Sequence, residues 1–379
     1  MGKERARIAH TPTTTKQKVG SLLKPIVNCK VPLSLRQTVL DKLIAKLGID
    51  AVEVEEKLCL TCNSKSEYKL KSLSFLRPSK ESESKPVVTD DDNIDSGMFE
   101  NFILPVETLT KEGFPTEISE YEKIEKPKNR ICDRCLRRFN PCEEMTTCRY
   151  HFGRTQYKGE RRYTCCNEVI GSDPCVESDT HVFSIKDCKE LDFQKSFGIG
   201  LPLLALDCEM VYTSLGLDLC RISIVDNSLS TVLDIIVRPE APIIDYNTRF
   251  SGITEQYMQE FKSVLPKGLL EQCKIPPKTN FTFEEAFKLY SALIGENTVV
   301  VGHGLKNDLI AMRLIHTRIV DTSILYPHKS NSGFKRGLRE LALRELNEFI
   351  QEGNGHDSIE DARISLRLAL KYIQRNSNK

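Results

Sequence analysis

Two carboxylates lie inside one short apolar run of this 379-residue chain. The run is PLLALDCEMVY, residues 202–212, and its acids are Asp207 and Glu209. In a β-strand, residues i and i+2 project from the same face, so both carboxylates would leave the strand together. Like charges held side by side repel, and a cation between them removes that repulsion. The run therefore predicts a strand that carries a metal site, the alternative being an edge strand whose acids face solvent.

The residues around this run predict a mixed α/β domain. Two further β-branched runs, 218–226 and 231–239, are separated from it and from each other by turn residues, which predicts three sequential strands. Three hairpin-linked strands followed by alternating helices and strands favour a mixed sheet with flanking helices. The remaining predicted elements are strands at 298–302 and 318–321 and helices at 283–294, 305–315, 337–350 and 358–374.

Two more carboxylates and a histidine follow in the same domain. Asp308 begins a helix after the strand and turn VVVGHG, and Asp361 lies in the first turn of the last predicted helix. His356 lies in a glycine-flanked loop five residues before Asp361. An acid at a helix start is favoured by the helix dipole alone, and a loop histidine is commonly just exposed. Together with Asp207 and Glu209, however, these residues form an ordered set.

A Cys/His block lies upstream of this domain. Residues 132–181 hold seven of the fourteen cysteines and two of the seven histidines. Eight ligands are what two closed tetrahedral Zn²⁺ sites require. Which four share one ion, and whether Cys142 is a ninth ligand, stays open, and buried free thiols are the alternative. The candidate zinc ligands are Cys132, Cys135, Cys148, His151, Cys165, Cys166, Cys175 and His181.

Charge is segregated along the chain, although 54 Lys and Arg nearly balance 53 Asp and Glu. The neutral total removes the simplest sign of a nucleic-acid binder, which is a basic whole chain. Locally, residues 79–125 hold four lysines and thirteen acids, whereas residues 126–162 hold eleven basic residues and four acids. Aromatic residues are interleaved with the second group. This suits RNA binding by phosphate contact and stacking, or a protein-interaction surface.

We expect four segments. Residues 1–76 form a partly helical, partly disordered N-terminal region with an amphipathic helix over 32–47, and residues 77–125 form an acidic linker with a short helical segment. A zinc-binding module over 126–190 and the α/β domain over 200–379 follow. No run approaches 18 apolar residues and the N-terminus has no apolar signal core, so we expect neither a membrane partner nor secretion.

The order of these motifs resembles the DEDDh family of 3′-to-5′ exonucleases, a branch of the ribonuclease H-like fold. Within that family, ALDCEMVY, DYNTRFSGIT, VVGHGLKNDL, IVDTSILYPH and GHDSIEDA are similar to the RNA exonuclease 1 (Rex) group. The Cys/His block also fits this group, and its phrases CRYHFG and YTCC resemble the CHORD zinc module. The resemblance implies a ribonuclease H-like mixed sheet.

The resemblance also implies the catalytic residues. Asp207, Glu209, Asp308 and Asp361 would bind two catalytic Mg²⁺ or Mn²⁺ ions, and His356 would be the general base. Hard carboxylate oxygens suit these ions, and two ions about 4 Å apart stabilise both the attacking and the leaving oxygen. An imidazole titrates near neutral pH and can take a proton from water.

Substrate contacts are implied next to these residues. Met210 either packs against the terminal base or fills the core, and both interpretations stay open. Asn247, Thr248 and Arg249, in DYNTRFSGIT, would contact the terminal sugar or phosphate, with Arg249 the best candidate for a phosphate. Asp321 would order the floor of the site rather than bind metal.

The predicted function is a nuclear 3′-to-5′ exoribonuclease that releases 5′-monophosphates in RNA processing or turnover. Nuclear placement rests on the resemblance and on the basic N-terminus. RNA is the predicted partner, with proteins as further candidates for the zinc module. A deoxyribonuclease or a mixed nuclease stays open, because the carboxylates do not distinguish RNA from DNA and only a 2′-OH contact does. A catalytically silent RNA- or protein-binding adaptor is disfavoured, because a silent site has no need to keep like charges clustered.

Overall fold

The computed structural model describes most of the chain after residue 94 and less of what precedes it. The described residues are 51–62, isolated positions between 31 and 72, 94–117, 128–143, 146–157, 160–185, 190–327, 335–348, 350–351 and 356–377. The chain divides into two compact units, Met1–Glu83 and Ser84–Lys379. Most of the helix predicted over 32–47 and the first part of the predicted acidic linker lie outside the described residues.

The first unit contains helix α2 (Ala51–Thr61) and a buried polar triad. Arg36 donates two hydrogen bonds to the carboxylate of Glu55 on α2, at 2.8 and 2.7 Å. The hydroxyl of Tyr68 donates to the same carboxylate at 2.5 Å. All three side chains are buried, and a buried charge is tolerated where it is paired and hydrogen-bonded in this way.

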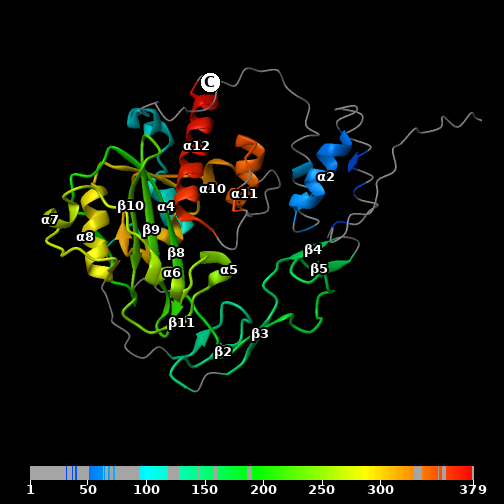
Figure 1. The fold of residues 1–379 in the computed structure, drawn as a ribbon. Coiled ribbons are helices and arrows are strands. Elements are labelled where there is room, and N and C mark those ends of the chain that lie inside the picture. Colours follow the sequence, from blue (N-terminus) through cyan, green and yellow to red (C-terminus); the bar gives the residue numbers. More distant parts are fainter. Residues whose placement is uncertain are drawn as a thin grey trace, which may run out of the picture. The chain divides into compact units, whose positions relative to one another are not determined.

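A mixed sheet forms the centre of the second unit (Figure 1). In spatial order the strands are β12 (Asn280–Phe281), β10 (Thr231–Val237), β9 (Gly216–Asp226), β8 (Leu203–Thr213), β13 (Val299–Gly302) and β15 (Ile319–Asp321), with β11 (Ile243–Asp245) paired to β8. Strands β8, β9 and β10 are joined as two antiparallel hairpins, as the sequence predicted. Strand β13 pairs parallel with β8, and β15 pairs parallel with β13.

Helices cover both faces of this sheet because its strands alternate between two apolar clusters. Leu203 and Ala205 of β8 belong to the cluster beneath the last helix, α12 (Ser358–Asn376). Leu204 and Leu206 belong to the opposite cluster, together with α8 (Phe283–Leu293) and α9 (Lys306–Ala311). Helix α12 runs along β8 and β9, as Figure 1 shows. The sheet is therefore the middle layer of the domain, and the strand that carries the two acids lies within it.

Two predicted helices end early, for local reasons. The helix predicted over 305–315 ends at Ala311, because Arg313 has a left-handed φ of 50° and the chain then enters β14 (Leu314–Ile315). The helix predicted over 337–350 ends at Leu346, before Asn347 with a φ of 60°. It is split into α11 (Leu338–Leu341) and a π-helical turn, η4 (Ala342–Leu346). The other short helices are α5 (Thr248–Ser251), α6 (Glu255–Glu260), α7 (Leu269–Gln272) and α10 (Thr322–Leu325).

The segment before the Cys/His block belongs to the core of the sheet. It forms a 3-10 helix, η2 (Ser96–Phe102), and helix α4 (Val106–Glu112), drawn in cyan in Figure 1. Phe99 is fully buried in the α12 cluster, and the amide of Leu104 donates to the carbonyl of Ile319 at 2.9 Å. This half of the predicted linker is thus packed against β15.

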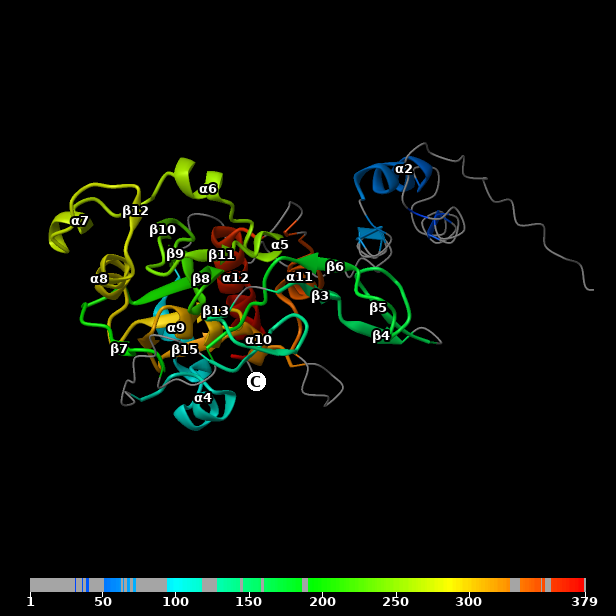
Figure 2. The ribbon, with the colours of Figure 1, turned by 90° about the horizontal axis from the view of Figure 1, so that it is seen from below.

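The Cys/His block folds as short antiparallel pairs with little apolar core of its own (Figure 2). Its buried apolar cluster consists of Cys132, Cys148 and Val182, so other interactions must hold it together. Its strands are β1 (Arg130–Ile131), β2 (Arg138–Phe139), β3 (Cys148–Tyr150), β4 (Thr155–Tyr157), β5 (Arg161–Tyr163) and β6 (Val176–Ser178), and β7 (Gln194–Lys195) follows and pairs with β14.

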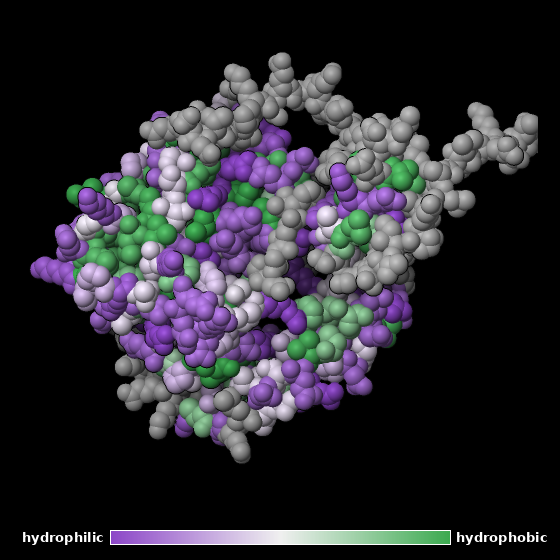
Figure 3. Space-filling model, in the orientation of Figure 1, coloured by the Kyte–Doolittle hydropathy of each residue, from purple (hydrophilic) through white to green (hydrophobic). Residues whose placement is uncertain are grey.

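Among the described residues, no helix combines the length and apolar character that a membrane span requires. The face seen in Figure 3 carries its apolar residues in separate patches among hydrophilic ones.

Candidate active site and metal centres

Strand β8 presents Asp207 and Glu209 toward one side of the sheet. In register with β9, Asp207 lies opposite Ser223 and Glu209 lies opposite Arg221. A bulge between Glu209 and Met210 then shifts the pairing by one residue. Glu209 is 6% exposed, so this carboxylate belongs to the buried layer and not to a solvent-facing edge.

Asp308 comes from the first turn of α9 and is held against β8. Its Oδ1 accepts a hydrogen bond from the amide of Cys208, the residue between the two strand acids, at 3.0 Å. The turn before it is ordered by Asp321, which accepts from the amides of Gly304 and Leu305 at 2.9 and 3.0 Å. Asp321 therefore holds the turn that leads into α9, and its predicted role in ordering the floor of the site stays a prediction.

Asp361 and His356 come from the start of α12. Nδ1 of His356 lies 3.6 Å from Oδ2 of Asp361, which is buried. The side-chain amide of Gln351 donates to both oxygens of that carboxylate, at 3.1 and 2.8 Å. The backbone amide of His356 donates to the carbonyl of Phe250 on α5 at 2.9 Å. The loop histidine is thus attached to two different parts of the domain.

Burial and neighbouring negative charges raise the pKa of all four carboxylates. Burial raises the pKa of Asp207 well above its ordinary value, and the charges of Asp308, Asp361 and Glu209 raise it further. Burial and the charge of Asp361 raise the pKa of Glu209 to about 9. Burial also raises the pKa values of Asp308 and Asp361 to about 7. The nearby positive charge is therefore too small to offset burial and repulsion at these carboxylates.

Arg221 is a cation whose charge acts on Asp207 and Glu209, and it was not predicted from the sequence. Its guanidinium donates to both oxygens of buried Asp234, at 2.9 and 3.0 Å, and to Asp357 at 3.3 Å. Its charge lowers the pKa values of Asp207 and Glu209, but less than burial raises them. A charged residue inside the apolar run LCRISIV was the available signal.

The carboxylate set fits hard divalent cations. Oε1 of Glu209 is buried and has no hydrogen-bond partner among the described residues, as expected of a metal ligand. Oxygen ligands of this kind suit Mg²⁺ or Mn²⁺. In the described part of the chain, the four carboxylates do not place one oxygen each within 4.8 Å of one another.

Thermal stabilisation by Mg²⁺ should increase with pH. The pKa values of about 7 for Asp308 and Asp361 exceed the ordinary value of about 3.9, so without a cation the stability present in acid is lost as pH rises through 7. A cation on the ionised cluster restores that stability. Scanning fluorimetry with and without Mg²⁺ should show a Tm difference that grows between about pH 6 and pH 8. A pH-independent difference would contradict the assignment, and Asp361→Asn should flatten the curve.

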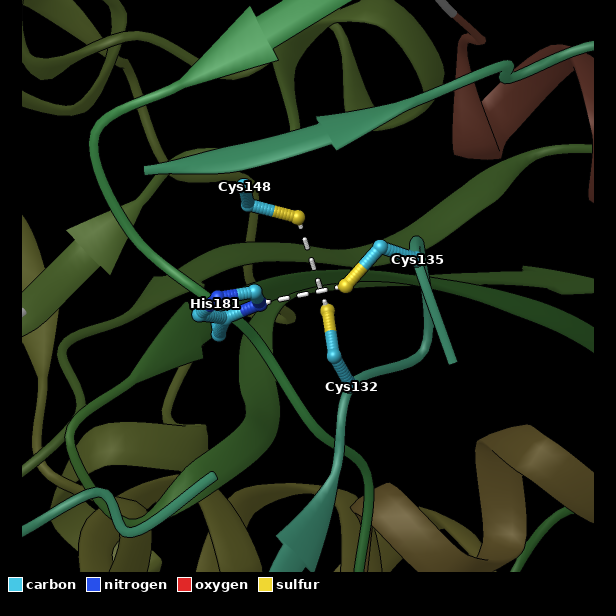
Figure 4. Close-up of side chains that lie close together, drawn as sticks. All are labelled: Cys132, Cys135, Cys148 and His181. Carbon is cyan, nitrogen blue, oxygen red and sulfur yellow. Dashed lines mark hydrogen bonds between the residues drawn. The ribbon is translucent and has the colours of Figure 1, made fainter. Parts of the chain in front are cut away.

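The Cys/His block brings its eight candidate ligands into two groups of four. Cys132, Cys135, Cys148 and His181 point toward one centre (Figure 4). Sγ of Cys132 lies 3.7 Å from Sγ of Cys148, and Sγ of Cys135 lies 3.2 Å from Nδ1 of His181. Two sulfurs bound to one tetrahedral Zn²⁺ at about 2.3 Å would lie about 3.8 Å apart, so the first spacing fits zinc.

In sequence, the whole second group lies between Cys148 and His181 of the first group. It consists of His151, Cys165, Cys166 and Cys175, and its Cys165 sulfur lies 3.9 and 3.6 Å from the sulfurs of Cys166 and Cys175. Gly153 is required here, because a Cβ at that position would lie 2.3 Å from the amide nitrogen of Cys165. Cys142 is exposed and in neither group. The grouping thus supplies the ligand pairing that the spacing left open.

Elemental analysis should find two zinc ions per chain. Cys135→Ser should lower the content to about one, because the second group keeps its four ligands. Cys142→Ser is the matched control, since this cysteine lies in neither group, and it should retain both ions. A chain that purifies without zinc, or that loses zinc equally in both variants, would contradict the two-site assignment.

Arg134, inside the Cys132–Cys135 loop, attaches the first group to the sheet. Its guanidinium donates to Asp245 of β11 at 2.7 Å and lies 5.3 and 5.4 Å from the ring centres of Tyr150 and Tyr212. Tyr212 is on β8, three residues after Glu209. The Cys/His block and the carboxylate strand are therefore joined through one half-buried cation.

The residues predicted to contact substrate lie along α5 and the end of the Asp-x-Glu motif. Asn247 adopts a left-handed φ of 53° just before α5, and the hydroxyl of Thr248 donates to the carbonyl of Ile253 at 2.6 Å. The guanidinium carbon of Arg249 lies 3.5 Å from the ring centre of Phe152. Met210 is half-buried and packs against the apolar cluster of the sheet. Their contacts with substrate stay predictions.

Known proteins match most of the described chain. Residues 204–369 match the exonuclease family model RNase_T. An RNA exonuclease 3 from Eremothecium gossypii is 38% identical over 285 residues, which cover 69% of this chain and 68% of that protein. The chain belongs to the Rex group of DEDDh exonucleases. Its fold is the ribonuclease H-like exonuclease fold, and it is an exonuclease, a hydrolase of phosphodiester bonds.

Other relatives are longer than the region they share with this chain. RNA exonuclease 3 of Schizosaccharomyces pombe is 32% identical over 86% of this chain and 58% of its own length. The human RNA exonuclease 1 homolog is 30% identical over 73% of this chain and 23% of its own length. Among solved structures, the Pan2 catalytic unit of Neurospora crassa is 26% identical over 50% of this chain and 30% of its own, with a TM-score of 0.40.

Proposed function

We propose that this chain is a 3′-to-5′ exoribonuclease that hydrolyses RNA 3′ ends to 5′-monophosphates with two catalytic divalent ions. The observation that supports this most is the set of four carboxylates, three of them buried and Asp207 half-buried, with His356 at 3.6 Å from Asp361. The relatives named RNA exonuclease support RNA as substrate, and the DEDDh family supports the direction.

His356 is the proposed general base. Burial and the positive charge of Arg339 lower its pKa, so the imidazole is neutral at physiological pH. A neutral imidazole can accept a proton from the attacking water. Asp357, the next residue, caps α12 through the amide of Ile359 and is held by Arg221, so the base sits on an anchored helix start.

The carboxylates are the proposed ligands of the divalent ions. Asp207, Glu209, Asp308 and Asp361 would hold Mg²⁺ or Mn²⁺, which stabilise negative charge on the attacking and leaving oxygens when bound. The chain fixes these ligands before substrate arrives: β8 sets two, the amide of Cys208 sets Asp308, and Gln351 holds Asp361.

The Cys/His module is proposed to bind two structural Zn²⁺ ions. Both groups contain four ligands and lack an open position, which is the arrangement of structural sites. The module would engage substrate or a protein partner. Nuclear localisation and a role in RNA 3′-end processing or turnover are proposed from the group resemblance and the basic residues 1–30.

Asp207→Asn should abolish RNA trimming while the protein stays folded, because it removes a charged ligand without changing side-chain volume. RNA labelled at its 5′ end should yield a ladder of labelled products with the unmodified protein and Mg²⁺, and none with the variant. Asp192→Asn, an exposed acid outside the site, is the matched control. Full trimming by Asp207→Asn would refute the proposed site, and direct release of a labelled mononucleotide would refute the direction.

The same assay on DNA separates the other functions. Equal trimming of DNA would support a mixed nuclease, and trimming of DNA alone a deoxyribonuclease. Binding of RNA without trimming, at any divalent ion tested, would support the silent adaptor and refute the proposed function.

His356→Ala should lower turnover by about 10²- to 10⁴-fold, the usual contribution of a positioned general base. Because the carboxylates remain, Mn²⁺ binding measured by calorimetry should be retained. The slope of rate against pH in the acidic limb should also disappear, since the titrating base is gone. Unchanged turnover would show that His356 is only a loop residue.

A further inference from the structure

A cavity of about 420 Å³ lies between the Cys/His module and the exonuclease sheet. One wall is formed by Tyr150, His151 and Phe152 of the module. The other is formed by Tyr212 of β8 and by residues 247–250, which include α5. The cavity therefore exists only where both parts of the chain meet, and its size suits one nucleotide.

Two aromatic side chains on this cavity are largely exposed. Phe152 is 40% exposed and Phe250 is 49% exposed, although most large apolar residues of this unit are buried. Exposed aromatic faces beside a cationic side chain are what single-stranded nucleic acids bind, by base stacking and phosphate contact. Arg249 supplies that cation, with its guanidinium against the Phe152 ring.

The other charged groups on the cavity are already paired. Arg134 is bound to Asp245, and Asp133 accepts hydrogen bonds from Ser184 at 2.6 Å and Tyr212 at 3.5 Å. For Arg249, by contrast, the structure gives a ring contact but no carboxylate partner among the described residues. A phosphate could therefore approach Arg249 without breaking an internal ion pair.

The cavity adjoins the proposed catalytic base. The carbonyl of Phe250 accepts a hydrogen bond from the backbone amide of His356, so one hydrogen bond connects the aromatic wall to the base. The opposite wall contains a zinc-ligand candidate, His151, between Tyr150 and Phe152. A metal in that group would hold the Phe152 wall in place against α5.

We propose that this cavity is a nucleotide subsite for the single-stranded RNA upstream of the reacting 3′ end. One unpaired base packs against Phe152 and Phe250, and its backbone phosphate pairs with Arg249. The Cys/His module is then part of the substrate path and not only a neighbouring domain. This inference rests on the proposed ribonuclease function and adds a subsite to it.

The test compares binding of a dinucleotide and an octanucleotide RNA, each labelled at its 5′ end, to the zinc-loaded full chain. The Asp207→Asn background prevents turnover, and fluorescence anisotropy gives the Kd. Phe152→Ala and Phe250→Ala should each weaken octanucleotide binding by about tenfold, within the range of one lost base stack. The ratio of dinucleotide to octanucleotide Kd should shrink accordingly.

Phe197→Ala is the matched control, because Phe197 is 65% exposed but does not line the cavity, and its ratio should equal that of the background. The zinc content of Phe152→Ala shows whether the module stays intact in that variant. If zinc is lost, Phe250→Ala, which lies outside the module, is the deciding variant. An unchanged ratio in the deciding variant overturns the subsite and leaves the proposed function standing. Failure of the unmodified protein to bind or trim RNA of any length overturns the proposed function itself.

Discussion

Repulsion among four clustered carboxylates, three of them buried and one half-buried, is the constraint on which the rest of the domain depends. The apolar sheet and its helices bury these acids, which raises the pKa values of Asp308 and Asp361 to about 7. The amide of Cys208 donates to Asp308 and the side-chain amide of Gln351 donates to Asp361, while Arg221 offsets part of the charge from the neighbouring strand. A fold stabilised elsewhere keeps an arrangement that is unfavourable until divalent cations bind.

The Cys/His module is held by a different interaction. It has little apolar core, and zinc bound by its two groups of four candidate ligands would supply the stability that an apolar core gives elsewhere. Arg134 then links the first group to Asp245 on β11 and to Tyr212 on the carboxylate strand. The module and the carboxylate set thus meet on the same strand, β8, which carries Asp207 and Glu209 near its middle and Tyr212 near its end.

Much of this could be predicted from the sequence, and the exceptions have physical reasons. Strands β8 to β10 and helix α12 follow from local periodicity, which is read within one element. The ligand pairing was not predictable, because it depends on which turns come together in space. Gln351 and Arg221 were missed because each acts across elements distant in sequence, and early helix ends at Ala311 and Leu346 reflect left-handed residues that no motif announced.

The number of Mn²⁺ ions bound by the zinc-loaded chain tests the central claim most directly. Calorimetric titration should find two sites per chain, with protons released at pH 7 because the carboxylates with pKa values of about 7 must ionise to bind. Glu209→Gln should remove or greatly weaken at least one site. Absence of Mn²⁺ binding would show that the carboxylates are not a metal site. So would Mn²⁺ binding that releases no protons and that Glu209→Gln does not weaken.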